Sequence, residues 1–420
     1  MKTLSLFSLL LVLLPLQQLQ AQSEAAVLFM LIQPSTRANG MAGASVASAE
    51  HDALSVAFNP AHIGLAAMDR SLHAEFYPSK TNWLPGFGIE GLTFEAGSIL
   101  LGYNFRRLNE SIPVSVGFGY SKVRINLGEQ VITDETGPEP IATFSSSEEA
   151  DIWSVGVGLD YFVKLGFGFN FKSIESNLSS VGAGAEIGTG RATANVHDFG
   201  VLLHWPILQT ISELSENSFE ILIPGLHPFL MPGFGYSKSN IGDSILFENA
   251  NQADPLPRVA RMALSVNTGL MYSTATIDLG VLSFEWSSEA EDGLVTRDPD
   301  GSFEYEGGLG DIDVFDNVLG GNADQNVQNT SGWELEFLDV FAIRRGSLDD
   351  VGGSRLFDAD GYGISLSGAL KLARILSPKL YSSRILTFVQ NHFDIQYDHS
   401  SFDGSALDGT EFDSIRVSFF

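Results

Sequence analysis

The chain has 420 residues, 44% of them hydrophobic, and it carries 51 Asp and Glu against 23 Lys and Arg, a net charge of -28. Such an acidic chain excludes a phosphate-neutralising surface for nucleic acid, because that surface needs clustered basic residues. The sequence contains no Cys, which excludes disulfide frameworks, thiolate zinc sites and thiol nucleophiles.

Residues 1–21 have the pattern of a secretory signal peptide. Lys2 precedes an apolar run that ends at Leu16, and a polar stretch then ends at Ala21, after which we expect cleavage. The apolar run has about 13 residues, whereas a membrane-spanning helix needs roughly 20. No later run approaches that length, so a membrane location requires a β-barrel, because only helices and closed barrels satisfy the backbone in lipid.

Residues 26–66 alternate poorly, and small residues dominate them, including Gly40, Gly43 and a run of Ala. A small, apolar segment that precedes the first strand can fold into the lumen of a barrel. We therefore expect residues 22–70 to form an N-terminal plug and residues 71–420 to form the barrel.

A period of two runs through the rest of the chain. In residues 153–161, for example, Trp153, Val155 and Val157 alternate with Ser154 and Gly156. Such alternation is typical of strands. The second face carries Gly and Ser rather than the Lys, Glu and Thr of a soluble sandwich, and it suits a barrel with lipid outside and a crowded interior. A soluble sandwich is the alternative.

Fourteen segments alternate in this way, an even number as bacterial single-chain barrels have. The sequence thus predicts an all-β fold, a transmembrane antiparallel barrel in the outer membrane of a Gram-negative bacterium, in contact with its lipid. The expected strands are 72–79, 88–106, 112–126, 150–162, 164–175, 193–204, 228–238, 256–268, 275–287, 332–338, 340–347, 360–371, 384–398 and 411–420.

Long and short connections between these strands alternate, as expected when the long loops lie outside the cell and the short turns in the periplasm. The segment 205–227 is a long connection on the periplasmic side, where we expect a short helix. The long outer loops include 127–149 and 288–331, and the latter holds eleven acidic side chains and one basic residue, Arg297.

The acidic loop 288–331 has two interpretations. The first is a solvated loop. The second is a divalent-cation site, because carboxylate oxygens are hard ligands, although the spacing lacks the order of an EF-hand loop. The candidate ligands are Asp298, Asp300, Asp311 and Asp313.

No catalytic motif is visible in the sequence. His-Glu-x-x-His, the Gly-x-Ser-x-Gly elbow, a Walker loop and a dinucleotide fingerprint are all absent. We therefore expect neither enzymatic activity nor a cofactor.

The N-terminal segment contains three groups of residues that together resemble a known family: Phe29–Pro34, Arg37–Met41, and Asp52 with the triplet Asn59-Pro60-Ala61. This segment is similar to the PorV/PorQ family of Bacteroidota-type outer-membrane proteins, itself similar to the FadL-like fourteen-stranded transporters. Ala42 stands where the family usually has Gly. An ordinary Asx-type turn also explains the Asn-Pro-Ala triplet. The motif residues are Arg37, Gly40, Met41, Asp52, Asn59, Pro60 and Ala61.

The resemblance implies a plug in the lumen and one of two roles. A PorV-like protein serves type IX secretion, where its partners are a translocon and secreted cargo proteins that the outer loops would bind. A FadL-like protein takes up hydrophobic, lipid-like molecules past a displaced plug, and Leu28, Phe29, Met30 and Ile32 are the candidate ligand contacts. We expect the secretion role, with FadL-like uptake as the alternative and a passive porin-like barrel as a third interpretation.

Overall fold

The computed structural model describes residues 25–134, 137–179, 190–215, 219–221, 223–242, 244–246, 253–297, 302–377 and 383–420. The expected signal peptide, residues 1–21, lies outside the described residues.

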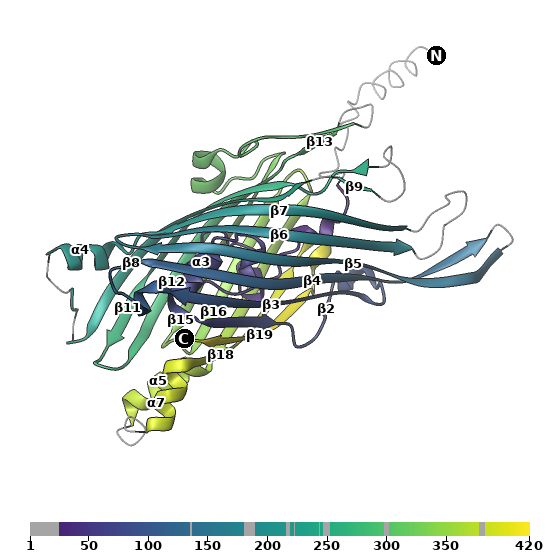
Figure 1. Cartoon of the computed structure of the whole chain (residues 1–420). Helices are drawn as coiled ribbons and strands as arrows, with labels where there is room; N and C mark the ends of the chain where they lie inside the picture. Colours follow the sequence, from purple (N-terminus) through teal and green to yellow (C-terminus); the bar gives the residue numbers. More distant parts are fainter. Residues whose placement is uncertain are drawn as a thin grey trace, which may run out of the picture.

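Fourteen strands of the described chain form one antiparallel sheet that closes into a barrel (Figure 1). Each strand pairs with its neighbours in chain order, and β1 closes the ring by pairing with both β19 and β3. The fold class expected from the sequence is confirmed. The strands are β1 (Leu72–Phe76), β3 (Leu92–Asn104), β4 (Val114–Asp134), β5 (Gly137–Asp160), β6 (Lys164–Ser179), β7 (Gly190–His204), β8 (Leu226–Gly242), β11 (Val259–Ser273), β12 (Asp278–Gly293), β15 (Val327–Phe337), β16 (Phe341–Asp350), β17 (Arg355–Ser365), β18 (Phe393–Asp403) and β19 (Glu411–Phe419).

Three short additions accompany the ring. The two-residue strand β2 (Thr81–Asn82) pairs with β3, beyond the end of β1. Two small hairpins stand apart from the ring: β9 (Ile245–Leu246) with β10 (Ala253–Asp254), and β13 (Val295–Arg297) with β14 (Phe303–Tyr305).

The helices are short. None in the described part of the chain has the length and apolar character needed to cross a membrane. They are η1 (Leu28–Leu31), α2 (Thr36–Asn39), η2 (Ser55–Ala57), α3 (His62–Asp69), η3 (Pro85–Phe87), η4 (Phe105–Arg107), α4 (Ile207–Ser215), η6 (Val314–Leu319), α5 (Leu366–Leu376), α7 (Arg384–His392) and η7 (Ser405–Leu407).

The outer face of the barrel is apolar. On β5, Trp153, Val155 and Val157 are exposed, whereas Ser154 between them is buried. Phe167, on the neighbouring strand β6, continues the same surface. An apolar belt around a closed barrel with an even number of strands is the surface that the outer-membrane bilayer covers. The protein is therefore an outer-membrane barrel of a Gram-negative bacterium, and the soluble sandwich is wrong.

The two ends of the barrel differ. At the end that we call the turn end, four connections are short and two are longer and carry α-helices: 105–113, 161–163, 205–225, 274–277, 338–340 and 366–392. The opposite end, the loop end, carries the β4–β5 extension and the longest connection, residues 294–326, which contains η6 (Figure 1). The helix expected within 205–227 is present as α4.

Two expectations about element boundaries are wrong. Residues 127–149 are not a loop, because β4 and β5 continue past the barrel as a two-stranded extension. Residues 366–371 and 384–392 are helical rather than extended. The side chain of Ser365 caps α5 by accepting a hydrogen bond from the Gly368 amide, and good helix formers such as Leu, Ala, Lys and Arg follow.

Candidate functional site

The N-terminal residues 25–70, which we call the luminal segment, lie inside the barrel (Figure 1). Glycines of the barrel wall make room for them. A Cβ atom added at Gly168 of β6 would lie 2.0 Å from the Pro60 carbonyl oxygen, and one at Gly235 of β8 would lie 2.0 Å from that of Val46. The inward Gly face of the strands thus lets the backbone of the segment pack directly on the wall.

The motif residues hold the fold of the luminal segment. Both carboxylate oxygens of Asp52 accept hydrogen bonds, from the Ser55 amide at 2.7 Å and from the hydroxyls of Ser35 and Ser55. Asn59 forms the Asx-type turn, because its Oδ1 accepts from the Ala61 amide at 3.1 Å. Its Nδ2 also donates to the Val46 carbonyl at 2.8 Å. These residues therefore organise the segment rather than form a reactive centre.

Two further motif positions meet the barrel wall. A Cβ atom at Gly40 would lie 3.2 Å from Arg344 of β16, and the backbone of Met41 contacts the Gly346 position closely. Ala42, at the position where the similar family usually has Gly, adopts a left-handed φ of 57°. This left-handed conformation favours Gly, so Ala42 adopts it at some cost in backbone strain.

Arg37 forms the centre of a buried charge cluster. Its guanidinium donates to Glu334 of β15 through Nε at 3.0 Å and Nη2 at 2.8 Å, and to Glu285 of β12 at 3.0 Å. It also donates to the Ser48 hydroxyl at 2.6 Å. Burial opposes the charge on Arg37, but Glu334 and Glu285 outweigh it and raise the pKa of Arg37 well above its usual value.

The cluster continues around the wall of the barrel. Arg344 pairs with Glu334 and, at 2.7 Å, with Asp398 of β18. Arg416 of β19 pairs with Asp398 at 2.8 Å and returns to Glu50 of the luminal segment at 3.0 Å. Each Arg of this cluster thus lies between two carboxylates, and the luminal segment contributes Arg37 and Glu50 to it.

Glu50 is the second residue of the luminal segment that joins the charge cluster. Arg70, at the end of the luminal segment, donates to Glu50 at 2.6 Å. Burial alone would raise the pKa of the Glu50 carboxyl, but Arg70 and Arg416 outweigh it and hold that pKa far below its usual range. Glu50 is therefore ionised at every physiological pH.

Three histidines meet beside this cluster. His62 Nε2 lies 2.9 Å from the Ser45 carbonyl, so it donates there, and its Nδ1 accepts from His51 Nδ1 at 2.9 Å. The ring of His204, on β7, stacks on His51 with centroids 5.4 Å apart. Burial lowers the pKa of His62 to about 4, so the ring is neutral at pH 7.

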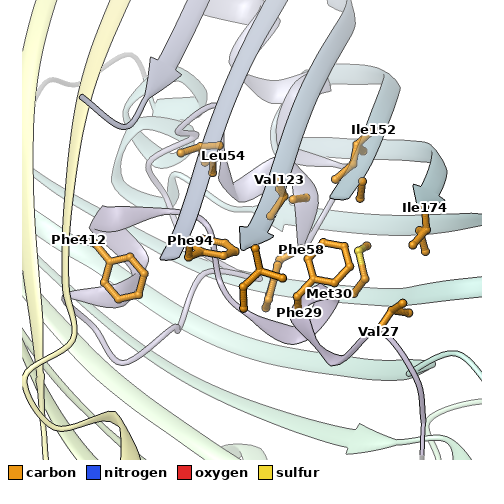
Figure 2. Close-up of a cluster of buried hydrophobic side chains, with 14 of the residues drawn as sticks. Val27, Phe29, Met30, Leu54, Phe58, Phe94, Val123, Ile152, Ile174 and Phe412 are labelled. Carbon is orange, nitrogen blue, oxygen red and sulfur yellow. The ribbon is translucent and has the colours of Figure 1, made fainter. Parts of the chain in front are cut away.

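An apolar cluster fills the lumen toward the loop end (Figure 2). Phe29, Met30 and Phe58 of the luminal segment face Val123 and Ile152 of the wall. A cavity of about 10 Å³ between them has room for one water molecule. Its lining consists of Phe29, Met30, Ile32, Pro34, Ala57, Phe58, Val123, Ile152 and Lys172.

Three of the four candidate ligand contacts, Phe29, Met30 and Ile32, thus line one cavity. The fourth, Leu28, is 48% exposed. The only charged side chain of the lining is Lys172, whose ammonium group pairs with Asp198 at 2.8 Å and donates to Asn240 at 3.0 Å. The polar edge of the cavity is therefore a neutral ion pair.

The barrel wall is weakly joined beside the apolar cluster. On one side of β19, strand β18 pairs with nine of its residues. On the other side, β1 pairs with only five residues of β19, Ile415–Phe419. Over residues 77–85 and 411–414, both fully described, no backbone hydrogen bond joins the two sides. Aromatic rings fill the junction instead, and Phe412 of β19 lies 6.2 Å from both Tyr77 and Trp83 by ring centroids. We call this junction the aromatic seam.

The candidate cation ligands do not converge in the described residues. Asp298 and Asp300 lie outside them. Asp313 caps η6 by accepting from the amides of Phe315 and Asp316, and Asp311 accepts from the Asn326 side chain at 2.6 Å. Within the described part of the chain, no three His, Asp or Glu side chains are arranged to hold a metal ion.

The wall partners of Arg37 were not identified from the sequence. The sequence does show charged residues at inward positions of strands whose apolar and polar residues alternate. They are the Arg37 partners Glu285 and Glu334, and the further cluster members Arg344 and Arg416. A charge at such a position was the available signal, because it must face either the lumen or lipid, and lipid excludes it.

No protein-family model and no curated protein matches the chain, so the PorV/PorQ resemblance has no confirmation from either comparison. Solved structures do match over nearly the whole length. A toluene transporter of Ralstonia pickettii, TbuX, shares 9% identity with a TM-score of 0.41, covering 92% of this chain and 97% of its own.

Two other solved structures are similar. The CymD monoaromatic hydrocarbon channel gives 9% identity and a TM-score of 0.38, with 91% of this chain and 95% of that chain covered. A FadL homologue of Pseudomonas aeruginosa shares 10% sequence identity with a TM-score of 0.36, and the match covers 92% of this chain and 96% of that chain. These three TM-scores are all below 0.5, and the function proposed below rests on the residues of this chain.

Proposed function

We propose that the protein admits hydrophobic small molecules through the outer membrane, as a FadL-like channel closed by its luminal segment. The observation that supports this most is the apolar cluster. Barrel lumens are ordinarily polar, yet here Phe29 and Phe58 meet Val123 and Ile152 inside the barrel. An apolar solute that enters from the loop end would exchange water for this surface.

The orientation follows from the loops. Outer-membrane barrels have short periplasmic turns and place their longest loops outside the cell. Four of the six connections at the turn end are short, whereas the longest connection, 294–326, and the β4–β5 extension lie at the loop end. We therefore assign the loop end to the exterior and the turn end to the periplasm. The apolar cluster then lies on the side from which a solute arrives.

The aromatic seam offers such a solute a route into the membrane. Wall strands held by a continuous ladder cannot part without losing hydrogen bonds, each left unsatisfied in lipid at a cost of several kcal/mol. No backbone hydrogen bond joins residues 77–85 to residues 411–414, and side chains alone connect these two segments. The segments can therefore part without breaking a backbone hydrogen bond. Tyr77 also donates to the Pro34 carbonyl at 2.7 Å, which connects the seam to the luminal segment.

The chemistry of the cavity favours neutral solutes. The Lys172 ammonium is already neutralised by Asp198, so it offers no net charge to an anionic head group. A ligand site needs roughly 300 Å³ or more, and the cavity holds about 10 Å³. Phe29 and Met30 must therefore move when a solute binds.

Equilibrium binding of naphthalene, followed by its own fluorescence, tests the proposal on the purified barrel. We expect Phe29→Ser and Phe58→Ser to weaken binding several-fold. Phe315→Ser is the matched control, because Phe315 is a 79% exposed aromatic on η6. Equal binding by all four proteins would overturn the proposal.

A secretion role is the second candidate, supported by the segment between β12 and β15. Its short helix η6 exposes Phe315 and Leu319, the latter 54% exposed, among acidic residues that include Asp311 and Asp316. Such a surface suits a protein partner. Affinity capture of the intact membrane protein distinguishes the roles: a co-purifying translocon or cargo protein supports secretion, whereas a bound apolar molecule with no partner supports uptake.

A further inference from the structure

The helices α5 and α7 form a hairpin at the turn end that projects beside β18 (Figure 1). Its attachment to the barrel is firm. Gly368 of α5 packs so closely on the 338–340 turn that an added Cβ would lie 1.8 Å from the Asp339 carbonyl oxygen. Lys371 pairs with the Asp339 carboxylate at 2.9 Å. The hairpin therefore presents a fixed surface.

On the hairpin, polar side chains are buried between the helices and apolar side chains are exposed, the reverse of a helix pair in a soluble protein. Arg374 of α5 and Gln390 of α7 are buried, and Arg374 donates to Gln390 between the two helices. The apolar side chains point away from them: Leu376 is 74% exposed, Ile385 76% and Phe388 55%. Contiguous exposed apolar side chains on a soluble surface are costly and mark a binding face.

The apolar face continues the lipid-facing belt of the barrel. Ile364 precedes α5 on β17 and is 49% exposed, and Ile395 follows α7 on β18 and is 45% exposed. Both are outward positions of wall strands. The hairpin thus extends the surface that already contacts lipid, and it does so at the rim of the membrane.

The charge of the hairpin complements an anionic membrane surface. Residues 366–392 contain no Asp or Glu but four Lys and Arg, in a chain whose net charge is -28. Two of these cations are engaged within the protein, because Lys371 pairs with Asp339 and Arg374 is buried against Gln390. Arg384 is exposed next to Ile385. A basic helix with exposed Leu, Ile and Phe lies in the interface of a bilayer, with its apolar face among the acyl chains and its cations at anionic head groups.

We propose that the α5–α7 hairpin inserts its Leu376, Ile385 and Phe388 face into the periplasmic leaflet of the outer membrane and binds anionic phospholipid there. The assignment to the periplasmic leaflet follows from the orientation given above. The hairpin anchors the turn end of the barrel to that leaflet, independently of what the lumen transports.

The absence of Cys makes a direct test straightforward. The full-length variants Phe388→Cys and Leu376→Cys, one on each helix, each carry one environment-sensitive fluorophore and are reconstituted into vesicles of phosphatidylethanolamine and phosphatidylglycerol. Phe87→Cys is the control, because Phe87 is a 62% exposed aromatic on η3, in the loop-end connection between β1 and β3. We expect quenchers attached to the lipid chains to act several-fold more strongly on the first two labels than on the third.

The head-group preference is tested with the same label. We expect the lipid quenching of the Phe388→Cys label to fall in vesicles of phosphatidylcholine alone, or when Arg384→Glu is added. Equal quenching in both vesicles would remove the anionic part of the proposal. Quenching by aqueous iodide at the level of the control would overturn insertion, and protection from both quenchers would overturn it in favour of a protein partner or a second copy.

Discussion

Arg37 and Glu334 form a two-point ion pair across 297 residues of sequence, with Nε–Oε2 and Nη2–Oε1 distances of 3.0 and 2.8 Å. The pair joins the luminal segment to the barrel wall where both side chains are shielded from water. Two parallel hydrogen bonds fix direction as well as distance. This pair therefore contributes to the orientation of the segment in the lumen, together with the Glu50–Arg416 pair.

Arg37→Met should loosen the luminal segment. It leaves the carboxylates of Glu334 and Glu285 buried with fewer partners, and breaking a buried pair costs about 3–5 kcal/mol. We expect a lower urea midpoint and a higher ionic conductance in planar bilayers. Arg345→Met, which removes an exposed guanidinium of β16, should change neither. An unchanged conductance in a folded Arg37→Met barrel would contradict the role of the pair.

Gly235→Val should displace the luminal segment without breaking the wall. The new side chain would collide with the Val46 carbonyl oxygen, which lies 2.0 Å from the Cβ position. We expect small-solute leakage to rise toward that of a variant lacking residues 25–66. Gly293→Val is the matched control, because nothing lies within 4 Å of its Cβ position. Equal leakage by the two variants would mean that the segment does not close the lumen.

Acid should destabilise the luminal segment through His62. Its pKa is about 4 in the folded protein and near 6.5 when unfolded, so between these values the unfolded state binds more protons. Stability is therefore complete above pH 6.5 and falls as the pH decreases toward 4, by up to about 3 kcal/mol.

The groups that face His62 are His51, Asp52, Glu50 and Arg37. Urea unfolding at pH 7 and pH 5 measures the loss, and His62→Gln, which retains a donor for the Ser45 carbonyl, should reduce it. A wild-type stability that is equal at both pH values would rule out this contribution.

Asp198→Asn should change the solute preference of the cavity. It removes the carboxylate that neutralises Lys172 and leaves a net positive charge at the polar edge. We expect binding of dodecanoate to strengthen while binding of naphthalene is retained. Calorimetric titration of both probes measures the change, and the double variant Lys172→Met/Asp198→Asn should abolish the gain. A gain that persists in the double variant would place the anion elsewhere.

The period-two pattern was sufficient to locate all fourteen wall strands, because lipid and lumen impose opposite demands on alternate residues. It failed at residues 366–371 and 384–392, where the chain leaves the wall and a Ser365 cap starts a helix. It also placed residues 127–149 in a loop, although the strands there continue beyond the bilayer, where no lipid constrains them.

The site could be predicted only in part. Phe29, Met30 and Ile32 were recognisable as a local apolar run, and the structure places all three on one cavity. The partners of Arg37 were not predictable, because Glu285 and Glu334 lie 248 and 297 residues away. Which inward residues face each other across a lumen depends on register and closure, and neither is encoded locally.

Strand β1, which closes the ring, comes directly after the luminal segment in the sequence. Helix α3 ends at Asp69 and β1 begins at Leu72, so only two residues join the segment to the strand that pairs with both β19 and β3. A force that pulls the segment out of the lumen therefore acts first on the hydrogen bond from the Ser71 amide to the Phe419 carbonyl, 2.7 Å long. Displacement of the part of the segment next to β1 therefore also pulls on the wall strand beside the aromatic seam.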